Sequence, residues 1–466
     1  MAALAWKRAV GRALLLLLLT ALAVGGGRRL WVRLEPAGRW PLLPNPWPLA
    51  LPAPPPGSAA PLLLDTPGWQ QRSLGNPARQ RYPHCWQARA RTPWDLILWQ
   101  QQLYLGLGDA SNEGATANAG PVPLLRYDPR RRLWHQDATL PEEAVERFVV
   151  DGERLWIPGA DARGSWRWGN LYGHRSGGLF WWQERRLPGF IHGHDLTPWR
   201  GALVVAGNLE HAVPAGLGTE RNGSAVAVST DGGSHWSVTP LGGWRSTALL
   251  PVAGQLYVVE ALPGPALQRW LTQQGRQSRF RAVHQWQKNG SWRARPDLTA
   301  AALLPEVPEA GRRFAWLEGV QRWGEGAAWI AAIGPAPGHR ATRQAFVASD
   351  LAAGRVAVQR IPLPPHAMAM DLAATDAGLV LLSSEPLGPG RWRQRIEQIH
   401  RGPAGWQRQL LLQFRTAAPV QSLAGRSGHW FLGLGPAPGA AGEKPSPTAP
   451  CTQAQTLSGT VVEVWR

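Results

Sequence analysis

The chain has very few lysines, cysteines and tyrosines. Lysine occurs only at Lys7, Lys288 and Lys444, although the formal net charge is +18, so arginine carries nearly all of the positive charge. The arginines are scattered along the chain, and their densest run is residues 130–132. This pattern does not favour a nucleic-acid-binding protein, in which basic residues gather on one face. It favours attraction to an anionic lipid, polysaccharide or protein surface.

Sequence patterns of several enzyme classes are also missing. No Ser-His-Asp order, phosphate-cradling glycine loop or Cys-x-x-Cys metal pattern stands out. Beyond residue 24 there is no second long apolar stretch, so the rest of the chain is expected to be soluble. Charged residues make up only 17%, whereas Gly 53 and Pro 43 are abundant. This composition predicts a turn-rich, mostly β protein.

The first 27 residues predict export. Lys7, Arg8 and Arg12 precede an apolar run, residues 13–24, which has the length of a signal-peptide core and is short for a membrane span. Residues 21–23, Ala-Leu-Ala, match a small-x-small cleavage site, and an uncleaved membrane anchor is the alternative. The expected location is periplasmic, extracellular or membrane-anchored outside the cytoplasm, with membrane contact through this segment only. Residues 28–75 follow as a Pro-rich linker in extended polyproline II conformation.

A short apolar segment recurs seven times in residues 76–466. The copies begin at Leu103, Leu155, Leu203, Leu256, Trp329, Leu379 and Trp430. Their spacings are 52, 48, 53, 73, 50 and 51 residues. A second pair of strands follows, and its closing residues are Trp134, Trp182, Trp236, Trp292 and Trp406, with Val358 in the fifth unit. Four short strands at a period near 50 predict an all-β fold, a β-propeller of seven four-stranded blades, with six or eight blades as alternatives.

Closure of the ring is expected near the two cysteines. Residues 461–465 predict the third strand of the last blade, and residues 85–88 are the predicted source of its fourth strand. Cys451 lies just before the final strand, so a Cys85–Cys451 disulfide is expected to staple the closure. Such a bridge contributes on the order of 4–5 kcal/mol in the chain-entropy model. Two unrelated thiols are the alternative, and either pair suits an oxidising compartment.

One hairpin carries the pattern Ser-x-Asp-x-Gly-x-x-Trp, formed by Ser229, Asp231, Gly233 and Trp236. Asp231 is expected to accept backbone N–H bonds across the turn, Gly233 to take positive φ, and Trp236 to cover the hairpin. The pattern resembles the Asp-box of sialidase-type (BNR) repeats. In that family the box lies on the outer rim of a propeller blade, away from the central site. The resemblance therefore implies architecture rather than chemistry.

A second resemblance covers the first part of the predicted ring. Residues 157–161 read Ile-Pro-Gly-Ala-Asp, residues 168–172 read Trp-Gly-Asn-Leu-Tyr, and residues 191–195 contain Ile-His and a closing Asp. This succession is similar to that of an uncharacterised family of exported propellers and is clearest over residues 95–240. It implies no reaction, because that family has no assigned activity to carry over.

Polar residues follow the first three repeat copies. If the strands run alike, these loops open on one face near the axis, where propellers usually bind ligands. The candidate ligand-binding residues are Asp109, Asn112, Glu113, Asp161, Asn170, His192, His194, Asp195, Asn208, Glu210 and His211. For Asp161 and Asn170, capping of turns is the alternative role.

His192 and His194 would point the same way on a strand, and Asp195 could complete a divalent metal site with them. The alternative is that Asp195 and His192 bond to the backbone and hold blades together. No cofactor is expected and no metal is assigned.

We interpret the chain as a monomeric binding or scaffold propeller that recognises a glycan or protein on one face, and no catalytic residue is assigned. A sialidase-like glycoside hydrolase is the alternative. It would require an arginine trio and a Tyr–Glu pair at the central funnel, and Tyr172 and Tyr257 are the tyrosines to consider. An extracytoplasmic assembly factor, by architectural likeness to photosystem II assembly propellers, is the third hypothesis.

Overall fold

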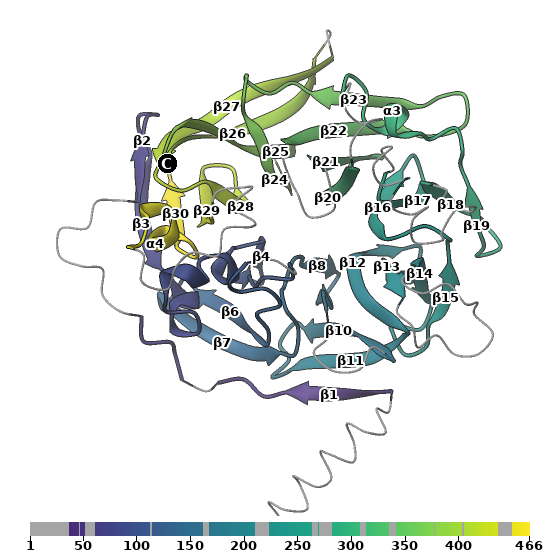
Figure 1. Cartoon of the computed structure of the whole chain (residues 1–466), viewed down its shortest axis with the longest axis horizontal. Helices are drawn as coiled ribbons and strands as arrows, with labels where there is room; N and C mark the ends of the chain where they lie inside the picture. Colours follow the sequence, from purple (N-terminus) through teal and green to yellow (C-terminus); the bar gives the residue numbers. More distant parts are fainter. Residues whose placement is uncertain are drawn as a thin grey trace, which may run out of the picture. The chain divides into compact units, whose positions relative to one another are not determined.

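The computed structural model describes residues 37–45, 47–51, 61–111, 114–161, 167–209, 223–262, 269, 282–307, 314–334, 342–376, 378–402, 405–436 and 450–466. The chain divides into two compact units, Met1–Gly38 and Arg39–Arg466, and the second contains the folded sheets. Within this unit seven antiparallel sheets follow one another around a common axis, each with its first strand innermost (Figure 1). The unit is a seven-bladed β-propeller, as the repeat period predicts.

The first four blades contain the following strands. Blade 1 consists of β4 (Asp95–Trp99), β5 (Gln102–Gly106), β6 (Val122–Asp128) and β7 (Leu133–Leu140). Blade 2 consists of β8 (Val149–Asp151), β9 (Arg154–Pro158), β10 (Trp168–Arg175) and β11 (Trp181–Pro188). Blade 3 consists of β12 (Phe190–Trp199), β13 (Ala202–Leu209), β14 (Ser224–Ser229) and β15 (Ser237–Pro240). Blade 4 consists of β16 (Ser246–Val252), β17 (Gln255–Glu260), β18 (Val283–Trp286) and β19 (Trp292–Ala294).

The remaining blades complete the ring. Blade 5 consists of β20 (Phe314–Trp323), β21 (Gly326–Gly334), β22 (Thr342–Asp350) and β23 (Ala357–Ile361). Blade 6 consists of β24 (Met368–Thr375), β25 (Gly378–Gly388), β26 (Arg391–Gly402) and β27 (Gly405–Thr416). Blade 7 consists of β28 (Val420–Arg426), β29 (His429–Leu434), β30 (Val461–Trp465) and β3 (Gln70–Gly75). Short helical segments lie outside the sheets: η1 (Pro77–Gln80), η2 (Cys85–Gln87), η3 (Arg89–Arg91), α3 (Ala300–Leu303) and α4 (Gln453–Leu457).

Each of the seven apolar segments found in the sequence is the second strand of a blade, from β5 to β29. Every residue of β13 and of β21 is buried, because a second strand is covered on both faces by the neighbouring blades. Burial on both faces explains why these segments are continuously apolar rather than alternating. Apolar side chains such as Val259, Trp329 and Phe346 fill the space between blades 4 and 5.

The N-terminal segment adds an outer strand to each of two blades and backbone hydrogen bonds to a third. β1 (Gly38–Leu42) extends blade 2 beyond β11, and β2 (Leu62–Leu64) extends blade 6 beyond β27. Between them, the backbone N–H groups of Asn45 and Leu49 donate to the carbonyl oxygens of Gln136 and Trp134 in β7 of blade 1. Residues 28–75, expected to be a linker, thus include a belt along the outer edges of blades 2, 1 and 6.

The fourth strand of blade 7 is β3, in which Gln70 pairs with Trp465 and Gly75 with Val461. The prediction that residues 85–88 would form this strand is wrong. Cys85–Gln87 is instead a 3₁₀ turn, η2, which packs near α4. The expectation that residues 461–465 form the third strand agrees with β30.

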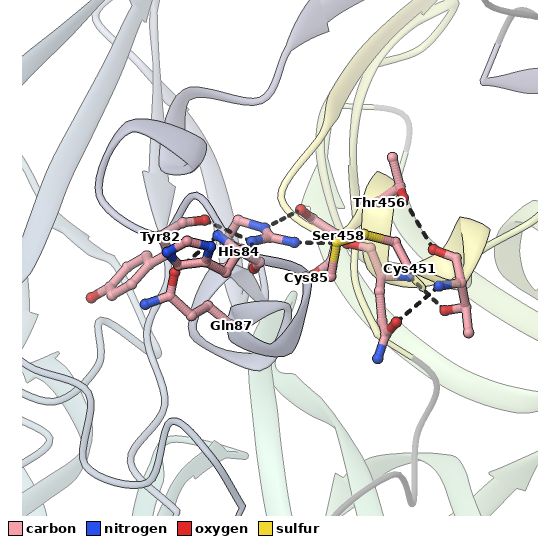
Figure 2. Close-up of a disulfide and its surroundings, with 10 residues drawn as sticks. Tyr82, His84, Cys85, Gln87, Cys451, Thr456 and Ser458 are labelled. Atoms are coloured by element: carbon pink, nitrogen blue, oxygen red, sulfur yellow. Dashed lines mark hydrogen bonds between the residues drawn. A yellow bond between two sulfur atoms is a disulfide. The ribbon is translucent and has the colours of Figure 1, made fainter. Parts of the chain in front are cut away.

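Figure 2 shows the seam between η2 and α4. Cys85 and Cys451 are joined by a disulfide, with Cα atoms 5.5 Å apart and a sequence separation of 366 residues. Beside it the buried guanidinium of Arg91 donates hydrogen bonds to the carbonyl oxygens of Tyr82, His84, Gln455 and Ser458, at 2.7, 2.7, 2.7 and 3.0 Å. One side chain thus fastens both ends of the ring.

Aspartates on first strands join three blades to the next blade, and one of them, Asp195, is buried. In each, one carboxylate oxygen accepts a backbone N–H of the following blade. The pairs are Asp95 with Phe148 at 2.6 Å, Asp195 with Leu249 at 2.8 Å, and Asp371 with Leu423 at 2.8 Å. Burial raises the pKa of all three carboxyl groups, that of Asp95 to about 7.

Candidate functional site

The propeller has two distinct faces. The loop face carries the connections from second to third strands and from each fourth strand to the next blade, and the turn face carries the remaining connections. The hairpin of residues 229–236 joins β14 to β15 and therefore lies on the turn face. Most sequence-predicted ligand residues lie at the loop face. Four other predicted ligand residues, Asn112, Glu113, Glu210 and His211, lie outside the described residues.

The turn-face hairpin is held by one carboxylate. Oδ1 of Asp231 accepts the Ser229 hydroxyl at 2.8 Å and the backbone N–H groups of Ser234 and His235 at 3.0 and 2.9 Å. The His235 bonds are the main reason that the pKa of Asp231 lies below its usual range. Gly233 has φ +94°, and its carbonyl oxygen accepts the Trp236 indole N–H at 3.0 Å. All of these interactions are internal to the turn and stabilise it.

Asp109 does not join the other candidates. It is fully buried, accepts the hydroxyls of Ser111 and Thr116 at 2.6 Å each, and forms an ion pair with Arg89 at 3.2 Å. Because its oxygens are occupied by these groups, Asp109 holds the loop after β5 against the segment that contains η3.

Glu142 is a central residue that the sequence did not single out. It precedes β8, is fully buried, and accepts the amide of Asn170 at 2.6 Å and the hydroxyl of Tyr172 at 2.7 Å through Oε1. Its Oε2 accepts the backbone N–H of Asp161 at 2.8 Å. Burial raises the pKa of Glu142 to about 7, although these bonds oppose the shift. Glu142 thereby fixes the start of the loop after β9.

The two histidines of β12 lie next to this loop. Nδ1 of His192 donates to the carbonyl oxygen of Ala160, and its Nε2 is 3.9 Å from the carboxylate of Asp161. The rings of His192 and His194 stack at 5.3 Å, so they do share one side of the strand. Burial lowers the pKa of both, that of His192 to about 3, with the charge of Arg245 as a further cause. Both rings are therefore neutral at physiological pH.

Arg245 faces these groups from blade 4. Its guanidinium carbon lies 4.5 Å from the ring centre of Trp244 and 6.0 Å from that of Trp316 in β20, and Trp316 also contacts His194 edge-on at 5.0 Å. Burial lowers the pKa of Arg245 to about 10, with Asp161 acting in the opposite direction. Among the residues that the structure describes, no hydrogen-bond partner reaches the buried Nε of Arg245 or the buried Nε2 of His194.

We call Asp161, His192, His194, Arg245 and Trp316 the loop-face cluster. Its members come from blades 2, 3, 4 and 5 and lie at the loop-face ends of the inner strands or in the adjoining loops. Arg245 and Trp316 were missed in the sequence because no local motif marks them. Asn208, in β13, pairs with His192 across the sheet and has a buried Oδ1 without a partner among the described residues.

Asp195 lies beyond the cluster and has a different role. Besides joining blades 3 and 4, it forms an ion pair with Arg147 at 3.1 Å, and Arg147 donates to the carbonyl oxygen of Val320 in blade 5 at 2.7 Å. The described part of the chain contains no group of three or more His, Cys, Asp or Glu side chains arranged to hold a metal ion. His192, His194 and Asp195 are thus not brought together as metal ligands.

The requirements of the hydrolase hypothesis are met only in part. Tyr172 does pair with a glutamate, Glu142, as a sialidase-like site would require. Both side chains, however, have no exposed surface, and burial together with Glu142 raises the pKa of Tyr172 well above its usual value. In this structure the pair is closed to solvent, and its bonds with Asn170 and the backbone of Asp161 hold the loop after β9.

Comparisons with known proteins give no family assignment. No family model matches the sequence, and no curated protein matches it. Among solved structures, a chain of the mitotic checkpoint complex is similar over 91% of this chain and 99% of its own length, with a TM-score of 0.44 and 10% identity. Kuenenia stuttgartiensis hydrazine synthase is similar over 74% of this chain and 93% of its own, with a TM-score of 0.42 and 12% identity. The α-L-arabinanase of Cellvibrio cellulosa is similar over 57% of this chain and 93% of its own, with a TM-score of 0.30 and 13% identity. Likeness at this level gives no indication of activity.

No helix among the described residues is long and apolar enough to cross a membrane.

Glu142 makes stability depend on pH. Because its folded-state pKa of about 7 exceeds the ordinary value of 4.5, the folded protein binds more protons than the unfolded chain between these values. The contribution of Glu142 is therefore fully present below about pH 4 and is lost as the pH rises to about 7. We expect the difference in unfolding free energy between wild type and Glu142→Gln to shrink by up to about 3 kcal/mol over this range. Chemical denaturation at pH 5 and pH 8 measures this difference in unfolding free energy, and Glu153→Gln, at an exposed position, is the control. If the stability of wild type and of Glu142→Gln changed in parallel with pH, the prediction would be wrong.

Proposed function

We propose that this chain is an exported binding propeller of the Asp-box type that recognises a carboxylate-bearing saccharide at the loop-face cluster. Arg245 is the observation that carries the proposal. Its guanidinium lies 4.5 Å from the ring centre of Trp244 and 6.0 Å from that of Trp316, and its buried Nε has no partner among the described residues. The planar group carries donors that match a carboxylate. Aromatic rings beside it suit the apolar face of a sugar, and neutral His194 adds a polar edge.

Two further features support export and the Asp-box assignment. A disulfide such as Cys85–Cys451 forms and persists in oxidising compartments, which agrees with the predicted signal segment. The bonds from Asp231 to Ser229 and to the backbone across the turn are those expected from the Asp-box pattern. Neither feature bears on the ligand, which the cluster alone indicates.

The proposal is tested with full-length protein and a panel of uronate- and sialate-containing oligosaccharides, with their neutral counterparts beside them. Tryptophan fluorescence titration should show saturable binding of acidic members. Arg245→Gln should weaken that binding about 10- to 100-fold, since a hydrogen bond to a charged group is worth about 1.5–3 kcal/mol. Arg175→Gln, an exposed arginine on the turn face, is the matched control and should bind as wild type does.

Three results would contradict the proposal. Equal affinity of wild type and Arg245→Gln would remove the cluster from recognition. Binding of acidic peptides but no saccharide would indicate a protein partner. Turnover of fluorogenic glycosides by the folded wild-type protein would instead favour the glycoside hydrolase.

A further inference from the structure

A cavity of about 460 Å³ lies between blades 4 and 5, and its lining residues do not belong to the loop-face cluster. One wall is a sheet face of blade 4 that carries Gln255, Tyr257, Gln285 and Arg293. The opposite wall is the turn between β22 and β23 of blade 5, with Asp350 and Arg355. The volume falls in the range of about 300–1,000 Å³ that is typical of small-molecule sites.

The polarity of this wall changes along the blade. Tyr257 pairs with Gln285, and Gln285 with Arg293, so these three side chains share one face of the sheet. Farther along the same interface, Val259 of blade 4 and Phe346 of blade 5 belong to one cluster of buried apolar residues. A contact that served only to pack the two blades would stay apolar. The polar row therefore faces space that a polar molecule can occupy.

The walls of the cavity are rigid. Arg295 is nearly buried and binds Asp297 through two hydrogen bonds of 2.8 and 2.6 Å. It also donates to Gln285 at 3.2 Å and to the carbonyl oxygen of Leu351 in blade 5 at 2.9 Å. Because this guanidinium bridges both blades, the cavity keeps its shape without a ligand.

Both hydrogen-bond acceptors and hydrogen-bond donors line the cavity. Asp297 is 43% exposed at its side chain and Asp350 24%, so both carboxylates can accept further bonds. Arg293 is exposed, Arg355 contacts Asp350 only at 3.5 Å, and both can donate. Because guanidinium groups and carboxylates line the cavity together, neither an anion nor a cation meets walls of one opposite charge. An apolar ligand would desolvate these groups without compensation. Hydroxyl groups, which both donate and accept, satisfy every wall.

We propose that this cavity binds a neutral polyhydroxylated ligand, a saccharide unit, at a site separate from the loop-face cluster. Ala352 and Ala353 on the blade 5 turn leave room for a ring. Gln255 on the blade 4 wall supplies an amide whose oxygen already accepts from Gln285 at 3.3 Å.

The test is saturation-transfer difference NMR on the full chain with a panel of neutral hexoses, pentoses and disaccharides at millimolar concentration. Wild type should give saturable transfer to at least one member. Ala353→Trp, an exposed position whose enlargement fills the cavity, and Gln255→Ala should each reduce it at least fivefold. Ser427→Trp, on an exposed turn of blade 7, is the matched control and should leave it unchanged.

The outcomes separate the two sites. Arg245→Gln should leave the neutral-sugar signal intact, and Ala353→Trp should leave acidic-saccharide binding intact. Absence of transfer to every neutral sugar in wild type, or an undiminished signal in both cavity variants, would overturn this proposal without touching the loop-face cluster. Binding of sulfate or spermidine that Ala353→Trp abolishes, in place of any sugar, would assign the cavity to a charged ligand and overturn it too.

Discussion

Replacing Arg91 by methionine should lower the free energy of unfolding by about 3–5 kcal/mol. Arg91 has no exposed surface, and its guanidinium donates to four backbone carbonyl oxygens of η2, α4 and their flanks. Methionine fills most of the volume but leaves these acceptors without donors, and each buried unpaired group costs about 1–3 kcal/mol before water re-enters. Burial lowers the pKa of Arg91 only to about 10, so the charge is present at neutral pH.

Chemical denaturation of the full chain, followed by tryptophan fluorescence, measures this loss. Arg81→Met, an exposed arginine in the same segment, is the matched control and should change the midpoint little. Arg91→Lys should rescue only part of the stability, because an ammonium group cannot reach four acceptors in the planar arrangement that the guanidinium spans. Equal midpoints for Arg91→Met and Arg81→Met would show that the carbonyl groups find water instead.

Removing the disulfide should have an effect of similar size. The Cys85–Cys451 bridge closes a loop of 366 residues, and the chain-entropy model assigns about 5 kcal/mol to a loop longer than 100 residues. Cys451→Ala should therefore unfold at a clearly lower denaturant concentration than wild type under non-reducing conditions. Adding a reductant should shift wild type to the midpoint of Cys451→Ala and leave the variant itself unchanged. If full reduction left the denaturation midpoint of wild type unchanged, the expectation would be wrong.

The two changes act on one seam and should not be additive. The disulfide joins Cys85 of η2 to Cys451, two residues before α4 (Figure 2). Arg91 donates to His84 just before η2 and to Gln455 within α4. Once the disulfide is absent and α4 has loosened, the loss of Arg91 removes contacts that are already weakened. The double variant Arg91→Met/Cys451→Ala should thus lose less stability than the sum of the single variants.

The blade pattern was readable from sequence because it is local. Second strands such as β13 are buried on both faces, so they must be apolar throughout, and their spacing repeats with the blade. The hairpin at Asp231 was equally readable, since all its bonds lie within a few residues. Pairing of Cys85 with Cys451 could be inferred because the chain contains only these two cysteines.

The rest depended on tertiary neighbours. β3 reads Gln-Gln-Arg-Ser-Leu-Gly, and one of its six residues is buried, so no periodic pattern marks it as a strand. Its place is set by the exposed edge of β30, hundreds of residues away. No sequence pattern marks Arg245 or Glu142. The role of Arg245 depends on its neighbour Trp316, and that of Glu142 on its bond to the backbone of Asp161. Asp109 was predicted to bind a ligand from its loop, but its carboxylate forms an ion pair with Arg89.

The N-terminal strands β2 and β3 also constrain the order of assembly. β3 pairs with β30, so residues 70–75 must wait for residues 461–465 before blade 7 can exist. β2 likewise waits for β27, since Leu62 pairs with Thr416. Contacts between such distant segments are slow to form. β2 and β3 are thus among the last strands to dock, and the first six blades can form their own four strands before the ring closes.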